Sequence, residues 1–139
     1  MSSGLLIAII DDDDSAREAA AGLVRALGFN VAGYPDAATF LATADMSQIG
    51  CIITDMRMAG MSGLALYNHL RTSGIFVPTI LITAFPDNAT RERAGRVGLA
   101  GYLSKPLAPA ALLAAIRGAV DQSEPPTSMG PRTIEGEDA

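Results

Sequence analysis

Short runs of aliphatic residues, each closed by a polar residue, constrain the fold of this chain most strongly. The run at 5–10 contains only Leu, Ile and Ala and stops at Asp11, and the run at 51–53 is followed by Thr54 and Asp55. Runs without alternating polar residues are typical of strands buried on both faces of a parallel sheet. Such a sheet needs helices on both sides, so the pattern indicates an α/β domain.

Strand and helix patterns alternate along the chain. The predicted strands lie at 5–10, 29–33, 51–55, 78–83 and 101–104. The predicted helices begin near residues 14, 35, 62, 87 and 108. Five strands alternating with five helices predict a single (βα)5 domain with a five-stranded parallel sheet.

Two of the predicted helices differ in quality. In the first, Asp14 or Ser15 is the expected N-cap, and the apolar stripe is formed by Ala19, Leu23, Val24 and Leu27. The fourth, at 87–97, is weak because Gly95 lies inside it and costs roughly 1 kcal/mol relative to Ala. Its apolar surface is small because it carries Arg91, Arg93 and Arg96. These arginines form either a surface that binds a partner or simply a solvated helix face.

Charge divides the chain into two parts. Residues 1–120 hold ten acidic and nine basic residues, whereas residues 121–139 hold five acidic residues and one basic residue. A nearly neutral folded part argues against direct binding of nucleic acid through bulk charge. We predict a folded domain at 1–120 and a flexible acidic tail or linker, containing Pro and Gly, at 121–139.

Cysteine usage and hydropathy suggest the cellular setting. Cys51 is the single cysteine, and its apolar neighbours predict a buried, unreactive thiol. The start of the chain lacks the basic segment of a signal peptide, and four aspartates follow its first apolar run. No stretch reaches the ~20 apolar residues of a membrane helix. We expect a cytoplasmic protein.

Polar residues follow four of the predicted strands at the same topological level. They are Asp11 and Asp12 after the first strand, Asp55 at the end of the third, Thr83 at the end of the fourth and Lys105 after the fifth. The carboxyl ends of parallel strands meet at one edge, where ligands of α/β sheets bind. Crowded carboxylates repel one another and favour a hard cation such as Mg²⁺. The chain's only lysine adds a fixed positive charge, which we expect to pair with Asp55.

These residues lie in motifs that resemble the receiver domains of bacterial two-component response regulators, in particular receivers joined to helix-turn-helix output domains. The resemblance covers roughly residues 4–120. It is carried by Ile9-Ile10-Asp11-Asp12, Thr54-Asp55-Met56-Arg57-Met58, Gly60-Met61-Ser62-Gly63, Leu81-Ile82-Thr83-Ala84 and Lys105-Pro106. It implies a flavodoxin-like sheet of strand order 2-1-3-4-5 with helices on both faces.

The resemblance implies a reaction. Asp55 would accept a phosphoryl group from a sensor histidine kinase or a phosphotransfer protein. Mg²⁺ would be bound by Asp12, Asp55 and the backbone carbonyl of Arg57, while Asp11 would hold its water ligands. The protein would then be a signalling phosphoacceptor that catalyses only its own phosphorylation and dephosphorylation, rather than an enzyme acting on other substrates.

The resemblance also implies a switch. Thr83 and Lys105 would contact the phosphoryl oxygens, and Tyr102 would change rotamer when Thr83 moves. Lys105-Pro106 would be a cis peptide, which X–Pro bonds tolerate best. The fourth helix is expected to shift because its intrinsic propensity is poor. The face formed by the fourth helix, fifth strand and fifth helix would change, and a homodimer through it is one option.

The chain departs from the family pattern at two positions. Ala59 stands where the family usually has proline, and Leu107 replaces a frequent phenylalanine. Arg57 and Phe85 flank the site at positions that tune water access in the family. His69, the sole histidine, is expected to be a solvated surface residue.

Two other functions stay open at this point. Asp11 to Ser15 also fits the Asp-x-Asp-x-Thr/Ser pattern of haloacid-dehalogenase-like phosphatases, with Asp11 as nucleophile and Asp13 as acid/base. The chain leaves no room for a substrate-covering cap in that case. The third possibility is a receiver-like interaction module that is not phosphorylated.

Overall fold

The structure, a computed structural model, describes residues 6–123. Its strands are β1 (Leu6–Ile10), β2 (Asn30–Tyr34), β3 (Ile49–Asp55), β4 (Thr79–Thr83) and β5 (Gly101–Ser104). Its α-helices are α1 (Asp14–Ala26), α2 (Ala37–Thr43), α3 (Gly63–Thr72), α4 (Asn88–Val97) and α5 (Pro109–Ser123). A short 3₁₀ turn, η2 (Met46–Gln48), precedes β3. The predicted tail at 121–139 lies almost wholly outside the described residues.

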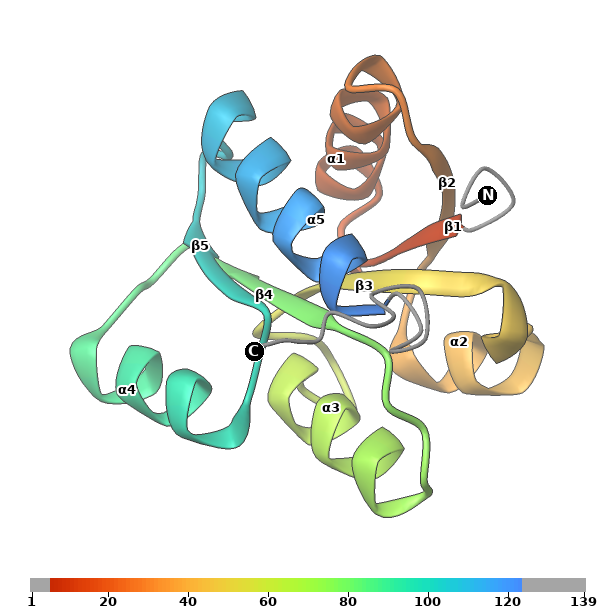
Figure 1. Ribbon diagram of the computed structural model, residues 1–139, viewed down its shortest axis with the longest axis vertical. Helices are drawn as coiled ribbons and strands as arrows, with labels where there is room; N and C mark the ends of the chain where they lie inside the picture. The colour runs from red at the N-terminus through yellow and green to blue at the C-terminus, as the bar shows by residue number, and fades with distance from the viewer. Residues whose placement is uncertain (1–5, 124–139) are drawn as a thin grey trace, which may run out of the picture.

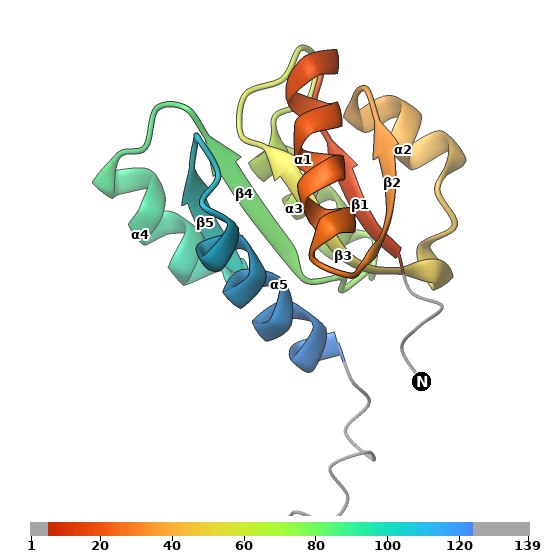
Figure 2. The same cartoon turned by 90° about the horizontal axis from the view of Figure 1, so that it is seen from above.

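All five strands are parallel and their order is β2-β1-β3-β4-β5. Helices α1 and α5 cover one face of the sheet, and α2 and α3 cover the other, with α4 beside β5 at the edge (Figure 1). The flavodoxin-like (βα)5 fold and the strand order are therefore as predicted. The arrowheads of the strands point toward the same edge of the sheet, and the candidate site lies at this edge (Figure 2).

The core has two main layers because successive side chains of a strand point to opposite faces. Ile7 and Ile9 of β1 pack toward α1 and α5, whereas Ala8 and Ile10 pack toward α2 and α3. Cys51 is fully buried in the first layer, and burial raises the pKa of its thiol to about 12. The prediction of a buried thiol is confirmed.

Helix α1 corrects two local predictions. Its N-cap is Asp13, whose side chain accepts a hydrogen bond from the Ala16 N–H, and neither Asp14 nor Ser15 takes this role. Its buried alanine is Ala20 rather than Ala19, which is exposed. Three consecutive alanines precede Gly22, so apolar periodicity alone does not determine which of them faces the sheet.

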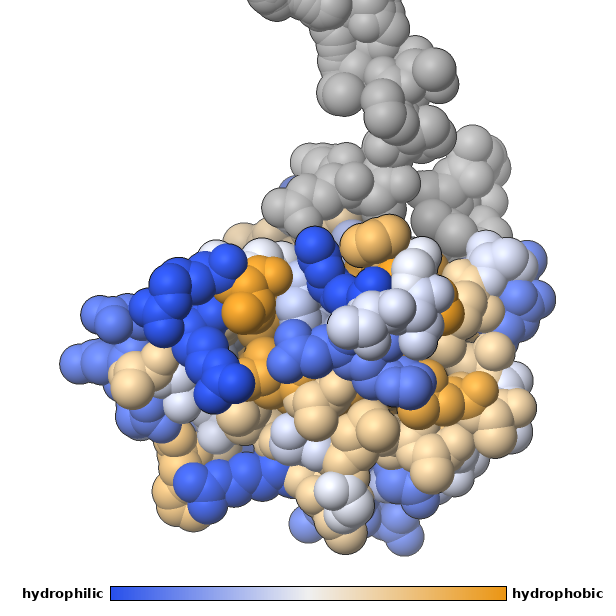
Figure 3. Space-filling model, turned by 90° about the horizontal axis from the view of Figure 1, so that it is seen from below, coloured by the Kyte–Doolittle hydropathy of each residue, from blue (hydrophilic) through white to orange (hydrophobic). Residues whose placement is uncertain are grey.

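Helix α4 is as poorly buried as its sequence predicts. Ala94 is its one buried residue, and Arg91, Arg93 and Arg96 are exposed. Hydrophilic side chains accordingly gather at the α4 end of the face that Figure 3 shows. Helix α5 runs to Ser123, three residues beyond its predicted end at 120. Strand β3 begins at Ile49, two residues before the predicted start.

Candidate functional site

Four strands deliver the predicted polar residues to one edge of the sheet. Asp55 is the last residue of β3 and Thr83 the last of β4, and both are buried. Asp11 directly follows β1 and is buried, whereas its neighbour Asp12 is exposed. Lys105 directly follows β5. The predicted convergence of these five residues is confirmed, since parallel strands end at a common edge.

Asp55 is held rigidly because β3 is buried along its whole length. Gly63, the first residue of α3, lies against it so closely that an added Cβ would collide with the backbone carbonyl of Asp55. Burial raises the pKa of the Asp55 carboxyl above its ordinary value of 3.8. The charges of Asp11 and Asp12 act in the same direction, and the hydrogen bond from Lys105 opposes them only in part.

Lys105 joins two of the carboxylates. Its Nζ lies 3.0 Å from Oδ1 of Asp55 and 3.3 Å from Oδ2 of Asp11. Burial by itself would lower the pKa of Lys105, but the hydrogen bond to Asp55 and the charges of both aspartates raise it overall. The Lys105–Pro106 peptide is cis, as predicted. The pairing with Asp55 was expected, whereas the bridge to Asp11 emerges only from the structure.

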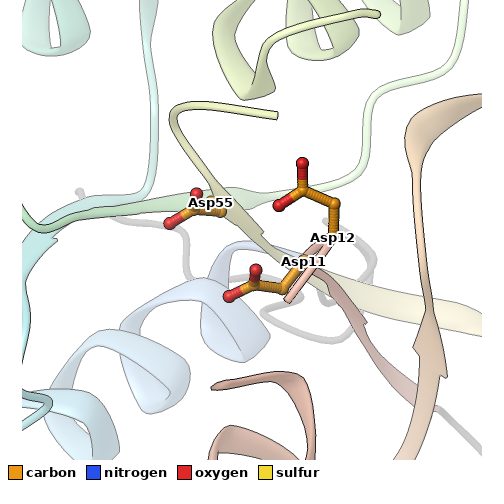
Figure 4. A group of neighbouring side chains, drawn as sticks. All are labelled: Asp11, Asp12 and Asp55. Atoms are coloured by element: carbon orange, nitrogen blue, oxygen red, sulfur yellow. The ribbon is translucent and has the colours of Figure 1, made fainter. Parts of the chain in front are cut away.

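The three carboxylates form a compact acidic pocket, defined by Asp11, Asp12 and Asp55 (Figure 4). One oxygen from each lies within 4.8 Å of the others. The donor set contains only oxygen, and the negative charges of Asp11 and Asp12 repel that of Asp55, a repulsion that a cation would relieve. The residues therefore fit a small hard divalent cation.

Backbone N–H groups from two different loops hold the side chains of Asp11 and Asp12. Oδ1 of Asp11 accepts a hydrogen bond from the Asp13 N–H at 3.0 Å. Oδ2 of Asp12 accepts one from the Ala59 N–H, also at 3.0 Å. The Asp13 carboxylate itself caps α1, so the acid/base role that a phosphatase would give it competes with a structural one.

Arg17 also shapes the pocket, although the sequence analysis did not single it out. Its guanidinium donates to the Asp11 carbonyl at 2.9 Å and pairs with Asp14 at 2.6 Å. Its aliphatic part lies beside Gly33 of β2, where an added Cβ would come within 3.4 Å of Arg17 Cδ. The three-residue spacing of Asp14 and Arg17 on the first helix could have predicted their ion pair from the sequence.

The predicted switch residues both hold the loop between β4 and α4. The hydroxyl of Thr83 accepts a hydrogen bond from the Phe85 N–H at 3.0 Å. The hydroxyl of Tyr102 accepts one from the N–H of Asp87, the N-cap of α4, at 3.3 Å. Arg91 lies over the Tyr102 ring at 4.8 Å. Movement of either hydroxyl would therefore release one end of this loop.

A hollow of about 290 Å³ opens beside Thr83. Arg57 and Phe85 line it, and the Arg57 guanidinium lies 5.1 Å from the centre of the exposed Phe85 ring. These two residues flank the site as expected, and the distance is one at which a cation–π contact forms. Thr83 and the Arg57–Phe85 pair therefore line the same hollow.

Known proteins similar to this chain identify its family. The family model described as the response regulator receiver domain matches residues 7–117. The chain belongs to this family. The transcriptional regulatory protein FixJ of Azorhizobium caulinodans is 37% identical over 123 residues, which make up 88% of this chain and 58% of FixJ. The response regulator protein TodT of Pseudomonas putida is 35% identical over 130 residues, covering 94% of this chain and 57% of TodT.

Solved structures agree with this assignment. The crystal structure of FixJ-N has a TM-score of 0.75 and 30% identity, covering 84% of this chain and 94% of that one. The chain spans somewhat more than half the length of the curated relatives FixJ and TodT. Within the described residues, no helix of the receiver domain combines the length and apolar composition needed to cross a bilayer.

Three residues singled out in the sequence, His69, Leu107 and Ala59, have side chains outside the acidic pocket. His69 is exposed on α3, as predicted. Leu107 packs partly buried against the core layer that contains α1 and α5. Ala59 is exposed in the loop after β3, and its side chain has no evident role.

Proposed function

We propose that this receiver domain is the phosphoacceptor of a two-component phosphorelay and that Asp55 takes the phosphoryl group from a histidine kinase or phosphotransfer protein. The observation that carries the proposal is the ion pair of Asp55 with Lys105 inside the acidic pocket. A carboxylate oxygen of Asp55 would attack phosphorus as the bond from phosphorus to the histidine nitrogen breaks. The imidazole would leave and take up a proton.

The proposed cation is Mg²⁺, held by Asp12, Asp55 and the Arg57 carbonyl, with Asp11 acting through water. When bound, it supplies positive charge for the phosphoryl oxygens, and phosphoryl transfer depends mainly on such neutralisation and on positioning. The all-oxygen donor set and the repulsion within the acidic pocket support this choice over a softer metal.

The ammonium of Lys105 is placed so that it can change partner during the reaction. It contacts both Asp11 and Asp55, so it can turn toward a phosphoryl oxygen on Asp55 while it keeps Asp11 as a partner. The backbone N–H of Lys105 donates a hydrogen bond to the Thr83 carbonyl at 2.8 Å, which holds the lysine backbone beside the site. An ammonium suits this role because it is a compact charge with three donors.

The proposed switch starts at Thr83. If its hydroxyl turns to donate to a phosphoryl oxygen, the Phe85 N–H loses its present acceptor. The loop would then repack, and Tyr102, which holds the N–H of Asp87, would move with it. Helix α4 buries only Ala94, so its displacement costs little apolar contact. We propose that the α4-β5-α5 face transmits the change.

The proposed partners follow from this role. A sensor histidine kinase or phosphotransfer protein supplies the phosphoryl group, and an output domain reads the α4-β5-α5 face. Homodimerisation through that face is one form of output. By analogy with FixJ, described as a transcriptional regulatory protein, the output is transcription regulation, with no direct contact between this segment and nucleic acid. The proposed location is the cytoplasm, in keeping with the free, buried Cys51 thiol.

One labelling experiment tests the proposal. The protein is incubated with Mg²⁺ and acetyl phosphate, or with a phosphorylated kinase, and phosphoaspartate is mapped by mass spectrometry. The expected result is label on Asp55 that disappears in Asp55→Asn and on removal of Mg²⁺. Label on Asp11 with turnover of phosphate esters would instead identify a phosphatase. Absence of label with every donor would identify an interaction module.

A further inference from the structure

The loop between β3 and α3 contributes a donor to the acidic pocket. The backbone N–H of Ala59 lies 3.0 Å from Oδ2 of Asp12, although the two residues are 47 positions apart. This hydrogen bond therefore joins the loop after β1 to the loop after β3. Figure 4 shows the Asp12 carboxylate turned to the side of the chain that follows Asp55, unlike the carboxylate of Asp11.

Asp12 needs such a donor more than its neighbours do. Asp11 and Asp55 are buried and share the ammonium of Lys105. Asp12 is exposed, and within residues 6–123 its hydrogen-bond partner is the Ala59 amide alone. An exposed carboxylate without a partner samples several rotamers. The amide restricts this sampling because it holds one of the two carboxylate oxygens, Oδ2.

The residue type at position 59 matters through its backbone. Proline, the usual residue of the family at this position, has no N–H and could not make this bond. Alanine supplies the donor with the smallest side chain that keeps ordinary backbone preferences. The departure from the family pattern therefore has a consequence at the site, even though the alanine side chain itself is exposed.

We propose that Ala59 is a positioning residue that, through its amide, holds Asp12 in place for a divalent cation. The inference rests on the cation site of the proposed function. Hydrogen bonds to a ligating carboxylate fix its orientation, and their loss typically weakens metal binding by about 10- to 100-fold. Asp12 is exposed and less constrained than a buried ligand, so we expect a change near the lower end of this range.

The test measures Mg²⁺ affinity of the full chain with no phosphodonor, by calorimetry or by amide chemical shifts. Ala59→Pro should bind Mg²⁺ about tenfold more weakly than the wild-type protein. Asn88→Pro is the matched control, because Asn88 is exposed and is the first residue of α4, where proline is tolerated. Its predecessor Asp87 has the extended conformation that precedes proline. Asn88→Pro should bind Mg²⁺ like the wild-type protein.

A second measurement needs no proline. Amide exchange at Ala59 should be about fivefold slower in the wild-type protein than in Asp12→Ala, as one hydrogen bond predicts. It should stay slow at saturating Mg²⁺, because a positioning contact persists when the cation binds. Faster exchange on addition of Mg²⁺ would mean that amide and cation compete, which would overturn the inference.

The outcomes separate the two proposals. If the wild-type protein binds Mg²⁺ and Ala59→Pro binds it equally well or more tightly, the positioning role is wrong and the phosphoacceptor function is unaffected. If the wild-type protein does not bind Mg²⁺, both the cation site and the positioning role are wrong. A drop in affinity confined to Ala59→Pro, together with slow exchange at saturating Mg²⁺, supports the inference.

Discussion

Substitution of Gly63 tests how closely α3 approaches the backbone of Asp55. Gly63 is the first residue of α3, and its N–H donates to the Met56 carbonyl at 3.1 Å, which closes the loop after β3. A methyl group there would collide with the Asp55 carbonyl and come within 2.9 Å of Leu81 Cδ2 and 3.1 Å of Thr54 Cγ2. Leu81 and Thr54 are fully buried, so neither side chain has space to retreat.

The expected cost of Gly63→Ala follows from these contacts. Overpacking a filled core typically costs 1–3 kcal/mol, and here one obstacle is a backbone carbonyl, so we expect about 2–3 kcal/mol. Helix propensity opposes this only weakly, because Ala gains at most about 1 kcal/mol over Gly even in a helix interior. Relief of the collision requires α3 or the end of β3 to shift, which would also displace Asp55.

Gly95→Ala is the matched control. Gly95 lies inside α4, and an added Cβ would meet no atom within 4 Å. This variant should gain roughly 0.5–1 kcal/mol because helical Gly loses more backbone entropy than Ala. Thermal melting of the two variants should differ by on the order of 10 °C, with opposite signs relative to the wild-type protein.

Two outcomes would contradict the close approach of α3 to Asp55 or its role at the site. If Gly63→Ala melts at or above the wild-type temperature, α3 does not approach Asp55 as closely as described. If it is destabilised but becomes phosphorylated as fast as the wild-type protein, the contact is structural and does not position Asp55. Loss of stability together with slow labelling of Asp55 would support the close approach as part of the site.

Three further predictions concern the pH dependence of stability and the hydroxyls of Tyr102 and Tyr67. Because the pKa of Asp55 is raised by burial, its contribution to stability is greatest below its ordinary value of 3.8 and falls as pH rises through the raised pKa. Asp55→Asn should flatten this part of the stability curve in urea denaturation and should not destabilise the Mg²⁺-free protein at neutral pH. Tyr102→Phe removes the acceptor of the Asp87 N–H and should speed amide exchange at the start of α4, at a cost of about 1 kcal/mol. Tyr67→Phe removes a 2.8 Å hydrogen bond to the Val97 carbonyl and should do the same at the end of α4, leaving exchange at its start unchanged.

Much of the fold was predictable from the pattern of residues. Continuous apolar runs marked the buried strands, and all five strands and five helices occur in the predicted order. Local details were less predictable. Asp13, Asp14 and Ser15 are all good N-cap residues, and the structure selects Asp13. Ala19 and Ala20 are chemically identical, so only the packing of α1 on the sheet decides which one is buried.

The order of residues along the chain was enough to predict which chemical groups could meet. An apolar run ends at each of four residues, Asp11, Asp55, Thr83 and Lys105. Because parallel strands end at one edge of a sheet, the convergence of these residues was predictable before the fold was known. The contacts that connect these groups are visible only in the folded protein. Lys105 bridges two carboxylates, and the Ala59 amide holds Asp12. Every residue except proline carries a backbone N–H, so Ala59 in the sequence shows only that a donor is present, and the acceptor that it meets depends on distances that packing alone sets.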